Sequence, residues 1–283
     1  MQDIPEIKPG QSIELLKELH ILTRDGKLNQ DSRRKLKQIY HLYQFIEPLL
    51  KEVQDARRAV QLVDHGAGKS YLGFILYDLF FKTLTDASHL YGIEARAELV
   101  NKSRNLAAQL NFPGMSFLHL SVAESITSEQ LPGKIDVVTA LHACDTATDD
   151  AIQFGLKKQA QFLVLVPCCQ AEVAAVLRKH KGRVLARSAL TELWRHPLHT
   201  REFGSHVTNV LRCLQLEAHG YQVSVTELVG WEHSMKNELI IASYKNLPRQ
   251  RARERLQEVL EALGLAEMDQ RFFTASAPDL RPV

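Results

Sequence analysis

The sequence predicts an α/β fold in which a mainly parallel sheet carries helices on both faces. Short apolar runs of strand length alternate with longer segments whose apolar residues recur at helical spacing. Helical segments between successive strands favour parallel pairing, because a parallel connection needs a long crossover. The predicted strands lie at residues 59–63, 88–94, 115–120, 134–141, 162–166, 221–230 and 237–245.

The first predicted strand ends in a glycine turn, Asp64-His65-Gly66-Ala67-Gly68. Glycine removes the side chain that would keep a ligand away from the backbone. A helical segment at residues 71–81 follows the turn, and the free N–H groups at its start favour a nucleotide-like ligand. We therefore predict that Asp64, Gly66, Ala67 and Gly68 bind a cofactor.

Two common nucleotide-binding loops do not fit this turn. A phosphate-binding loop of the form G-x-x-x-x-G-K-[ST] would need a glycine at Val63, which lies inside the predicted strand. A dinucleotide fingerprint G-x-G-x-x-G would need a glycine at Tyr71. The remaining pattern, D-x-G-x-G, resembles the first motif of class I S-adenosylmethionine-dependent methyltransferases. The resemblance implies S-adenosylmethionine as the cofactor.

Further cofactor contacts are expected where the second and third strands end. Glu94 ends the second strand, where a carboxylate can bind ribose hydroxyls; alternatively, it is a solvated residue at the start of the next helix. The resemblance places the third strand's end beside the adenine, so that Glu124, or the backbone at Val122 and Ala123, would accept a hydrogen bond from the adenine amino group. The spacing from Ser121 to Glu124 equally fits a helix-capping box.

The fourth strand ends in Leu141-His142-Ala143-Cys144-Asp145. Ligands of open α/β sheets bind at the carboxyl ends of the strands, so Leu141 and His142 are expected beside the cofactor. Asp145 or His142 is the candidate base that takes a proton from the methyl acceptor. Alternatively, His142 is a packed core residue and Asp145 caps the following helix.

The fifth strand ends in Pro167-Cys168-Cys169-Gln170, and this loop is expected to face the previous one across the cleft. Cys144, Cys168 or Cys169 could attack a pyrimidine ring if the thiol pKa is low, and Pro167-Cys168 favours Cys168; a strand-end cysteine is more often a small buried residue. The pattern L-H-A-C-D-x-A-T-D followed by P-C-C resembles a subgroup of class I methyltransferases. This subgroup includes the methyltransferase domain of glutathione S-transferase C-terminal domain-containing proteins.

The resemblance covers roughly residues 30–245 and implies a Rossmann-like sheet of seven strands that ends in an antiparallel hairpin. The expected organisation is a helical N-terminal segment at 1–57 that covers the cleft, a class I methyltransferase domain at 58–247, and a C-terminal helix and tail at 248–283. The subgroup informs about the cofactor more than about the substrate.

Basic residues in four parts of the chain, around Arg33, Arg178, Arg195 and Arg249, predict an RNA acceptor such as rRNA or tRNA if they converge on one face. Aromatic, imidazole and guanidinium groups alternate in residues 193–201, a mixture that suits phosphate contacts and base stacking. The predicted substrate-binding residues are Arg195, His196, His199, Arg201, His233, Lys236 and Asn237. A small-molecule or protein acceptor, and a cofactor-binding module without activity, are the alternatives.

Composition sets the remaining expectations. The chain has 283 residues, 45% hydrophobic and 24% charged, and a formal net charge of +2, which is typical of a globular protein. No apolar run approaches the ~18 residues of a membrane span, and the N-terminus lacks an apolar signal core, so we expect a cytoplasmic protein away from membranes. The four cysteines include no C-x-x-C pair, so neither disulfides nor a metal site are expected. No obligate protein partner is evident.

Overall fold

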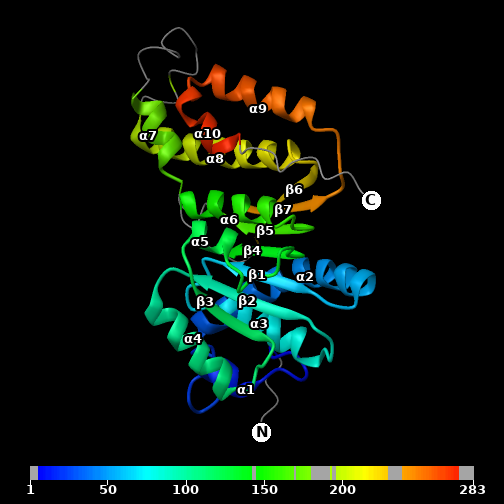
Figure 1. The fold of residues 1–283 in the computed structure, drawn as a ribbon. Helices are drawn as coiled ribbons and strands as arrows, with labels where there is room; N and C mark the ends of the chain where they lie inside the picture. Colours follow the sequence, from blue (N-terminus) through cyan, green and yellow to red (C-terminus); the bar gives the residue numbers. More distant parts are fainter. Residues whose placement is uncertain are drawn as a thin grey trace.

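A computed structural model describes residues 6–141, 145–168, 170–179, 192, 196–228 and 238–273. Within these residues, a seven-stranded sheet with the order β3-β2-β1-β4-β5-β7-β6 forms the centre of the molecule (Figure 1). β1 to β5 pair in parallel, and β7 runs antiparallel to both β5 and β6. The predicted fold class is therefore confirmed. The strands are β1 (Gln61–His65), β2 (His89–Glu94), β3 (Met115–His119), β4 (Val137–Leu141), β5 (Phe162–Val166), β6 (Tyr221–Glu227) and β7 (Glu238–Tyr244).

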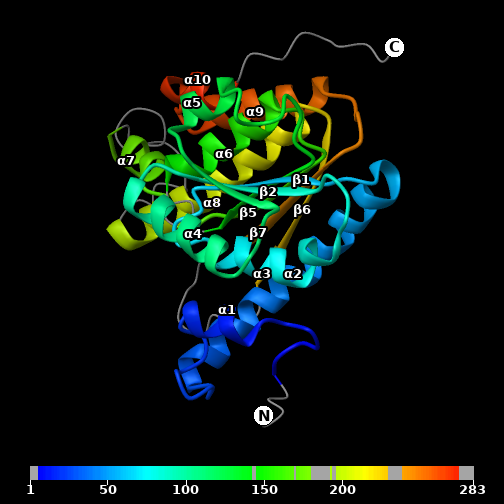
Figure 2. The same cartoon turned by 60° about the horizontal axis from the view of Figure 1, so that its bottom comes forward.

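Helices cover both faces of the sheet, as Figure 2 shows. One face packs on α2 (Gln30–Arg57), α3 (Tyr71–Leu79) and α4 (Ala97–Gln109), and α1 (Ile13–Glu18) joins the same core farther from the sheet (Figure 2). The other face packs on α5 (Val122–Thr127), α6 (Thr146–Lys157) and the end of α8 (Pro197–Glu217). The strands alternate between the two cores: Leu62 belongs to the first and Val63 to the second.

A third apolar core lies outside these layers. It joins α7 (Glu172–Lys179) and α8 to α9 (Gln250–Ala262) and α10 (Asp269–Phe272) through buried side chains such as Leu211 and Leu256. Two short 3-10 turns, Phe81–Thr83 and Ala266–Met268, complete the described elements. No described helix combines the length and the apolar character needed to cross a lipid bilayer.

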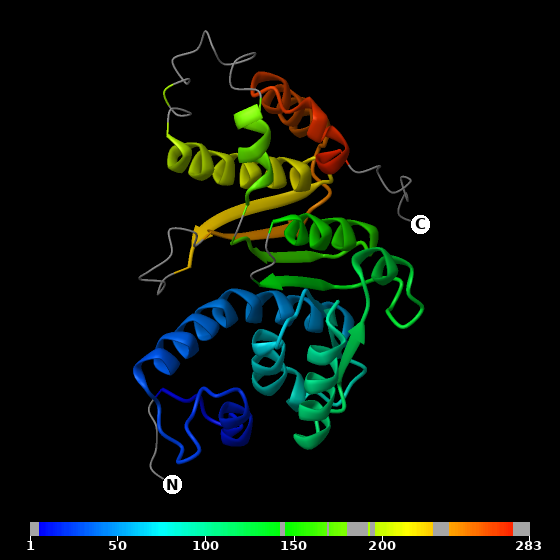
Figure 3. The ribbon, with the colours of Figure 1, turned by 90° about the vertical axis from the view of Figure 1, so that its left-hand side faces the viewer.

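The 28-residue helix α2 packs along one face of the sheet, and its first half lies near the edge where the parallel strands end (Figure 3). Asn29 caps it by accepting a hydrogen bond from the Ser32 N–H at 2.8 Å. Buried residues such as Leu36, Tyr43 and Leu50 recur on the side that faces the first core. Figure 3 shows that the first half of α2 extends past the carboxyl ends of the parallel strands. The beginning of the chain therefore flanks the edge where ligands of such sheets bind.

Candidate functional site

β1 runs into a turn whose backbone requires glycine. Gly66 has a φ of +69° and Gly68 a φ of +59°, and Ser70 is also left-handed just before α3. A Cβ on Gly66 would meet no described atom within 4 Å, so the backbone beside it is open to a ligand. The turn that we predict to bind the cofactor therefore lies at the carboxyl end of β1 with Gly66 exposed.

The side chain of Glu94 links the end of β2 to this turn. Its Oε2 accepts a hydrogen bond from the Gly68 N–H at 2.8 Å, and its Oε1 accepts from Nε of Arg96 at 2.8 Å and from the Arg96 N–H at 3.0 Å. Burial alone would raise the pKa of Glu94, but the hydrogen bonds from Arg96 and Gly68 outweigh it and lower the pKa. The carboxylate predicted to bind ribose is thus ionised and lies against the glycine turn.

Asp64 lies beneath the turn rather than on it. Its side chain is buried, and it accepts hydrogen bonds from the hydroxyls of Thr139 at 2.9 Å and Ser70 at 3.3 Å. Burial raises the pKa of Asp64 to about 6, against the effect of these two hydrogen bonds. Through these hydrogen bonds Asp64 supports the turn from inside the protein. Its contact with a cofactor stays a prediction.

His65 points to the opposite face of β1, where its ring lies 5.4 Å from that of Phe154. Its side chain is 4% exposed, and neither ring nitrogen has a hydrogen-bond partner in the part of the chain that the structure describes. Burial lowers the pKa of His65 to about 4, which keeps the imidazole neutral. The sequence reasoning used only the glycines and the acid of this motif and missed the histidine between them.

The capping box predicted at the end of β3 is present. The Ser121 N–H donates to Oε2 of Glu124 at 2.7 Å, and the Glu124 N–H donates to the Ser121 hydroxyl at 3.4 Å. Ala123 lies in the same exposed first turn of α5. Both residues follow β3, whose end pairs with Glu94, so they share its edge of the sheet. Their contact with adenine stays a prediction.

Asp145 joins the loops that follow β4 and β5. Its Oδ1 accepts a hydrogen bond from the Ala171 N–H at 3.2 Å, as the predicted approach of these loops requires. Asp145 occupies the N-cap position of α6, but its side chain makes no capping hydrogen bond within that helix. The helix-cap alternative is therefore wrong for the Asp145 carboxylate, which is directed to the neighbouring loop instead.

The other predicted residues are distributed as follows. Leu141 ends β4 and packs against the first core, and Cys168 is half-buried in the loop after β5. His196 and His199, with ring centroids 5.3 Å apart, are exposed at the start of α8. Arg201 in the same helix contacts Glu202 at 3.1 Å. Outside the described residues lie His142, Cys144, Cys169, Arg195, His233, Lys236 and Asn237.

Comparison with known proteins identifies the family. A family model described as a methyltransferase domain matches residues 34–176, which is half of the chain. The chain belongs to this methyltransferase family. It is 22% identical over 236 residues to the glutathione S-transferase C-terminal domain-containing proteins of Bos taurus and Homo sapiens. The predicted resemblance is thus confirmed. The match covers 77% of this chain and 34% of each relative, so the chain spans about a third of their length.

Comparison with solved structures finds methyltransferases at low similarity. Magnesium protoporphyrin IX methyltransferase from Synechocystis PCC 6803, with bound SAH, has a TM-score of 0.43 and 16% identity, over 81% of this chain and 94% of the other. An rRNA methylase from Streptococcus thermophilus has a TM-score of 0.40 and 11% identity, over 67% and 88% of the two chains. These similarities are too distant to identify a substrate.

The methyltransferase also contains a buried arginine that the sequence analysis did not single out. Arg212 of α8 is 0% exposed and forms two hydrogen bonds with the carboxylate of Asp149, at 2.6 and 3.0 Å. Its Nη2 donates to the backbone oxygen of Asp145 at 2.7 Å, and its Nη1 to Oδ1 of Asn209 at 3.2 Å. Ser205, Asn209 and Arg212 recur at helical spacing on one side of α8, and this polar spacing was the sequence signal for the network.

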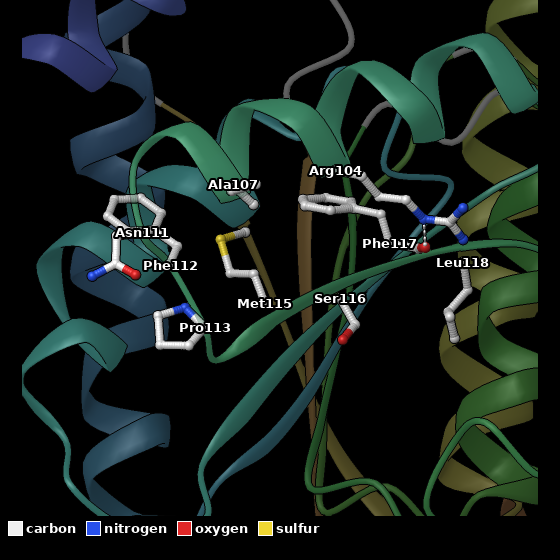
Figure 4. Close-up of a pocket in the computed structure, with 10 residues that line it drawn as sticks. Arg104, Ala107, Asn111, Phe112, Pro113, Met115, Ser116, Phe117 and Leu118 are labelled. Carbon is white, nitrogen blue, oxygen red and sulfur yellow. Dashed lines mark hydrogen bonds between the residues drawn. The ribbon is translucent and has the colours of Figure 1, made fainter.

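A hollow of about 440 Å³ lies away from this site, between α4 and the edge strand β3. Figure 4 shows Arg104, Asn111, Met115 and Phe117 around it. Nε of Arg104 donates to the Phe117 backbone oxygen at 2.8 Å, which occupies an outward carbonyl of the edge strand. The hollow runs along the outer side of β3, and not across the ends of β1 and β4. In the described ranges, no cluster of three His, Cys, Asp or Glu residues could hold a metal ion.

Proposed function

We propose that this methyltransferase binds S-adenosylmethionine on the glycine turn after β1 and transfers the methyl group to RNA. The observation that carries the proposal is the open backbone at Gly66, next to the ionised carboxylate of Glu94. Both lie at the edge of the sheet where β4 also ends and Asp145 follows. One edge therefore offers both a cofactor seat and a candidate base.

The residues of this edge fit the cofactor. Gly66 and Gly68 allow close approach to the backbone, and Glu94 can accept hydrogen bonds from a ribose diol. Ala123 and Glu124 would contact the adenine, and Leu141 would line the methionine end. When bound, S-adenosylmethionine supplies a methyl group on a positively charged sulfur. Because this group is already activated, the protein contributes mainly alignment and proton removal.

Asp145 is the proposed proton acceptor. The Ala171 N–H holds its Oδ1, and the carboxylate would take the proton that a nitrogen or oxygen acceptor loses. Cys168, in the loop that Asp145 contacts, is the proposed nucleophile if the acceptor is a pyrimidine carbon, and His142 is the other candidate base. Replacing Cys168 by serine separates the two routes, because only transfer to a pyrimidine carbon needs the thiolate, whereas both routes need a base to take a proton.

Exposed basic residues on two elements support an RNA acceptor. Lys35 and Lys37 lie in the first turns of α2, which extends past the strand ends (Figure 3). The first turns of α8 add Arg201 and two exposed histidines. Lysine and arginine contact phosphates in a largely sequence-independent way. These two elements therefore offer exposed basic groups near the edge of the sheet where the parallel strands end (Figure 3).

The predicted convergence of all four basic clusters is wrong. Ser243 near the end of β7 pairs with Phe162 at the start of β5, so the chain leaves β7 at the amino edge of the parallel strands. The basic run around Arg249 therefore begins at the edge opposite the glycine turn. Arg33 contacts Glu6 at 3.0 Å and Arg201 contacts Glu202 at 3.1 Å, which reduces the availability of both for phosphate. Among the residues that the structure describes, the basic groups of α2 and α8 support the RNA proposal; Arg195 and most of the cluster that begins at Arg178 lie outside them.

A second candidate acceptor carries an amino group, as in a protein or a small molecule. A hollow of only about 10 Å³, enough for about one water molecule, lies beside the loop after β5 and is lined by Glu202, Glu238, His206 and Asn209, so an amine could meet these acidic residues only at the surface. Negative charge there would repel a phosphate and attract a protonated amine. Of the two candidates, we favour RNA because its basic groups are more exposed than these carboxylates.

Incubation with methyl-tritiated S-adenosylmethionine tests both candidates. Total RNA and total protein, prepared from cells that lack the protein, serve as separate acceptor pools. We expect label in RNA, steeply reduced by salt, and none with a Gly66→Val variant. Label confined to the protein pool would favour the second candidate, and label in neither pool would contradict both. Mass spectrometry of nucleosides then identifies the methylated atom.

A further inference from the structure

Asp145 has a backbone conformation that needs outside support. Its φ of 49° and ψ of −115° lie outside the regions that a residue with a Cβ normally occupies. Such a conformation persists only where neighbouring groups hold it, and it is concentrated at functional sites. Two described hydrogen bonds act on this residue from outside its own segment: Arg212 binds its backbone oxygen, and the Ala171 N–H binds its carboxylate.

We propose that Arg212 is a positioning residue that holds the Asp145 carboxylate in place for proton removal. Arg212 lies in α8, 67 positions further along the chain, and has no route to the acceptor itself because it is completely buried. It acts through the Asp145 peptide, which its Nη2 holds at 2.7 Å. This inference rests on the proposed function, since it takes Asp145 as the base.

The orientation of the guanidinium is fixed by its other partners. Asp149 in the first turn of α6 accepts two parallel hydrogen bonds from it, an arrangement that a lysine cannot reproduce. Arg271 lies 3.7 Å from the same carboxylate and also pairs with Glu172 at the start of α7. These contacts hold the guanidinium of Arg212 in one orientation, in which its Nη2 points at the backbone oxygen of Asp145.

The same group of residues supports the loop after β5. Oδ1 of Asn209 accepts from Nη1 of Arg212 and from Nε2 of the buried Gln170, at 3.2 and 3.0 Å. The Ser205 hydroxyl donates to Oε1 of Gln170 at 2.6 Å. Gln170 precedes Ala171, whose N–H holds the Asp145 carboxylate. Both ends of the Asp145 contact are thus supported by α8, and a small shift of Arg212 would misplace the candidate base relative to both loops.

An Arg212→Lys variant tests this positioning role, because lysine keeps the positive charge but cannot donate two parallel hydrogen bonds to the Asp149 carboxylate. Misplacement of about 1 Å can cost on the order of 100-fold in rate, so we expect methyl transfer to total RNA to fall about 10- to 100-fold at saturating S-adenosylmethionine. We expect the calorimetric Kd for S-adenosylmethionine to stay within about threefold, because none of the described hydrogen-bond partners of Arg212 lies in the glycine turn. The Ala171 amide should exchange with solvent faster, as read by NMR.

Arg57→Lys is the matched control. Arg57 also forms an ion pair with a buried carboxylate, that of Asp136 at 2.6 Å, but this pair lies at the amino edge of the sheet. We expect the control to change neither the methylation rate nor the Ala171 exchange. An Arg212→Lys protein with wild-type exchange at Ala171 would overturn the inference, and so would faster exchange with an unchanged rate. Wild-type protein that labels no RNA would contradict the proposed substrate, and the exchange measurement would still decide whether Arg212 holds Asp145.

Ala171→Pro tests the same contact if Arg212→Lys fails to fold. Proline removes the N–H that binds the Asp145 carboxylate and is tolerated where a helix begins. Ala171 is exposed and directly precedes α7, so the third core stays intact. We expect the methylation rate to fall about tenfold with an unchanged Kd for S-adenosylmethionine. Full activity of the folded variant would overturn the inference.

Discussion

Gly68 donates its backbone N–H to Oε2 of Glu94 at 2.8 Å, although the two residues lie 26 positions apart. This hydrogen bond joins the turn after β1 to the end of β2. A parallel contact, from the Ala67 N–H to the Ile93 oxygen at 2.9 Å, strengthens the junction. The proposed cofactor seat is therefore a preformed unit of two strand ends.

Gly66→Val should abolish binding of S-adenosylmethionine. A β-branched residue is strained at a φ of +69°, and its side chain would fill the open space beside the turn. Calorimetry is expected to show no binding, whereas a Gly133→Val control should bind normally. Gly133 has no positive φ, and a Cβ there meets no described atom within 4 Å. Equal affinity of the two variants would place the cofactor elsewhere.

Arg96→Ala should tighten S-adenosylmethionine binding several-fold. The Arg96 side chain occupies both oxygens of Glu94, with Nε at 2.8 Å from Oε1 and Nη2 at 3.2 Å from Oε2. A ribose diol must compete with this guanidinium for the same carboxylate. Because the Arg96 side chain is 63% exposed, its ion pair contributes little to stability. Calorimetric titration checks the affinity, and weaker binding would mean that the guanidinium itself contacts the ligand.

His65→Leu should make the protein less sensitive to acid. The folded-state pKa of His65, about 4, is below its ordinary value, so the stability it contributes is present above pH 6.5 and is lost as the pH falls toward 4. At pH 5 this loss is about 2 kcal/mol relative to pH 8, from ~1.4 kcal/mol per pH unit. Urea unfolding at both pH values should show a smaller difference for the variant. If the unfolding free energy changed equally between the two pH values in the wild type and in the variant, the imidazole of His65 would be solvated.

Asp64 should oppose His65 in the same range. Its folded-state pKa, about 6, is above the ordinary value, so its contribution is greatest below pH 3.8 and is lost as the pH rises through 6. An Asp64→Asn variant can still bind the hydroxyls of Thr139 and Ser70 and has no buried charge. We expect it to gain stability relative to the wild type between pH 4 and pH 7. Constant relative stability across this range would show that Asp64 ionises freely.

Charge reversal distinguishes the two edges of the sheet as RNA-binding surfaces. Lys35→Glu with Lys37→Glu should raise the KM for total RNA and lower the salt dependence of binding by about one to two charges. Arg251→Glu with Arg253→Glu, on α9, is the control at the opposite edge and should leave both unchanged. A larger effect of the α9 variant would transfer the RNA-binding surface to that helix.

The sequence indicated those features that depend on strand-end chemistry. A sheet of this order brings the ends of β1, β2, β4 and β5 together, so the glycine turn, Glu94 and the Asp145 loop could be assigned to one edge. The placement of the Arg249 cluster was predictable too, because the expected antiparallel last strand must end at the opposite edge.

The support of Asp145 could not be predicted. Arg212 and Asp145 lie on different elements, and no spacing rule connects a residue in the middle of a helix with a loop 67 positions before it. The burial of Asp64 was equally hidden, because D-x-G-x-G specifies a turn but not which side of it the acid faces. Three-dimensional packing, and not local pattern, determines both contacts.

A crystal structure of the complex with S-adenosylhomocysteine would test the central claim most directly. We expect the ribose hydroxyls at Glu94, the amino-acid end against Gly66 and Gly68, and the sulfur directed toward the loop that contains Asp145. Ligand density in the hollow between α4 and β3, or any other position away from the glycine turn, would contradict the proposed site.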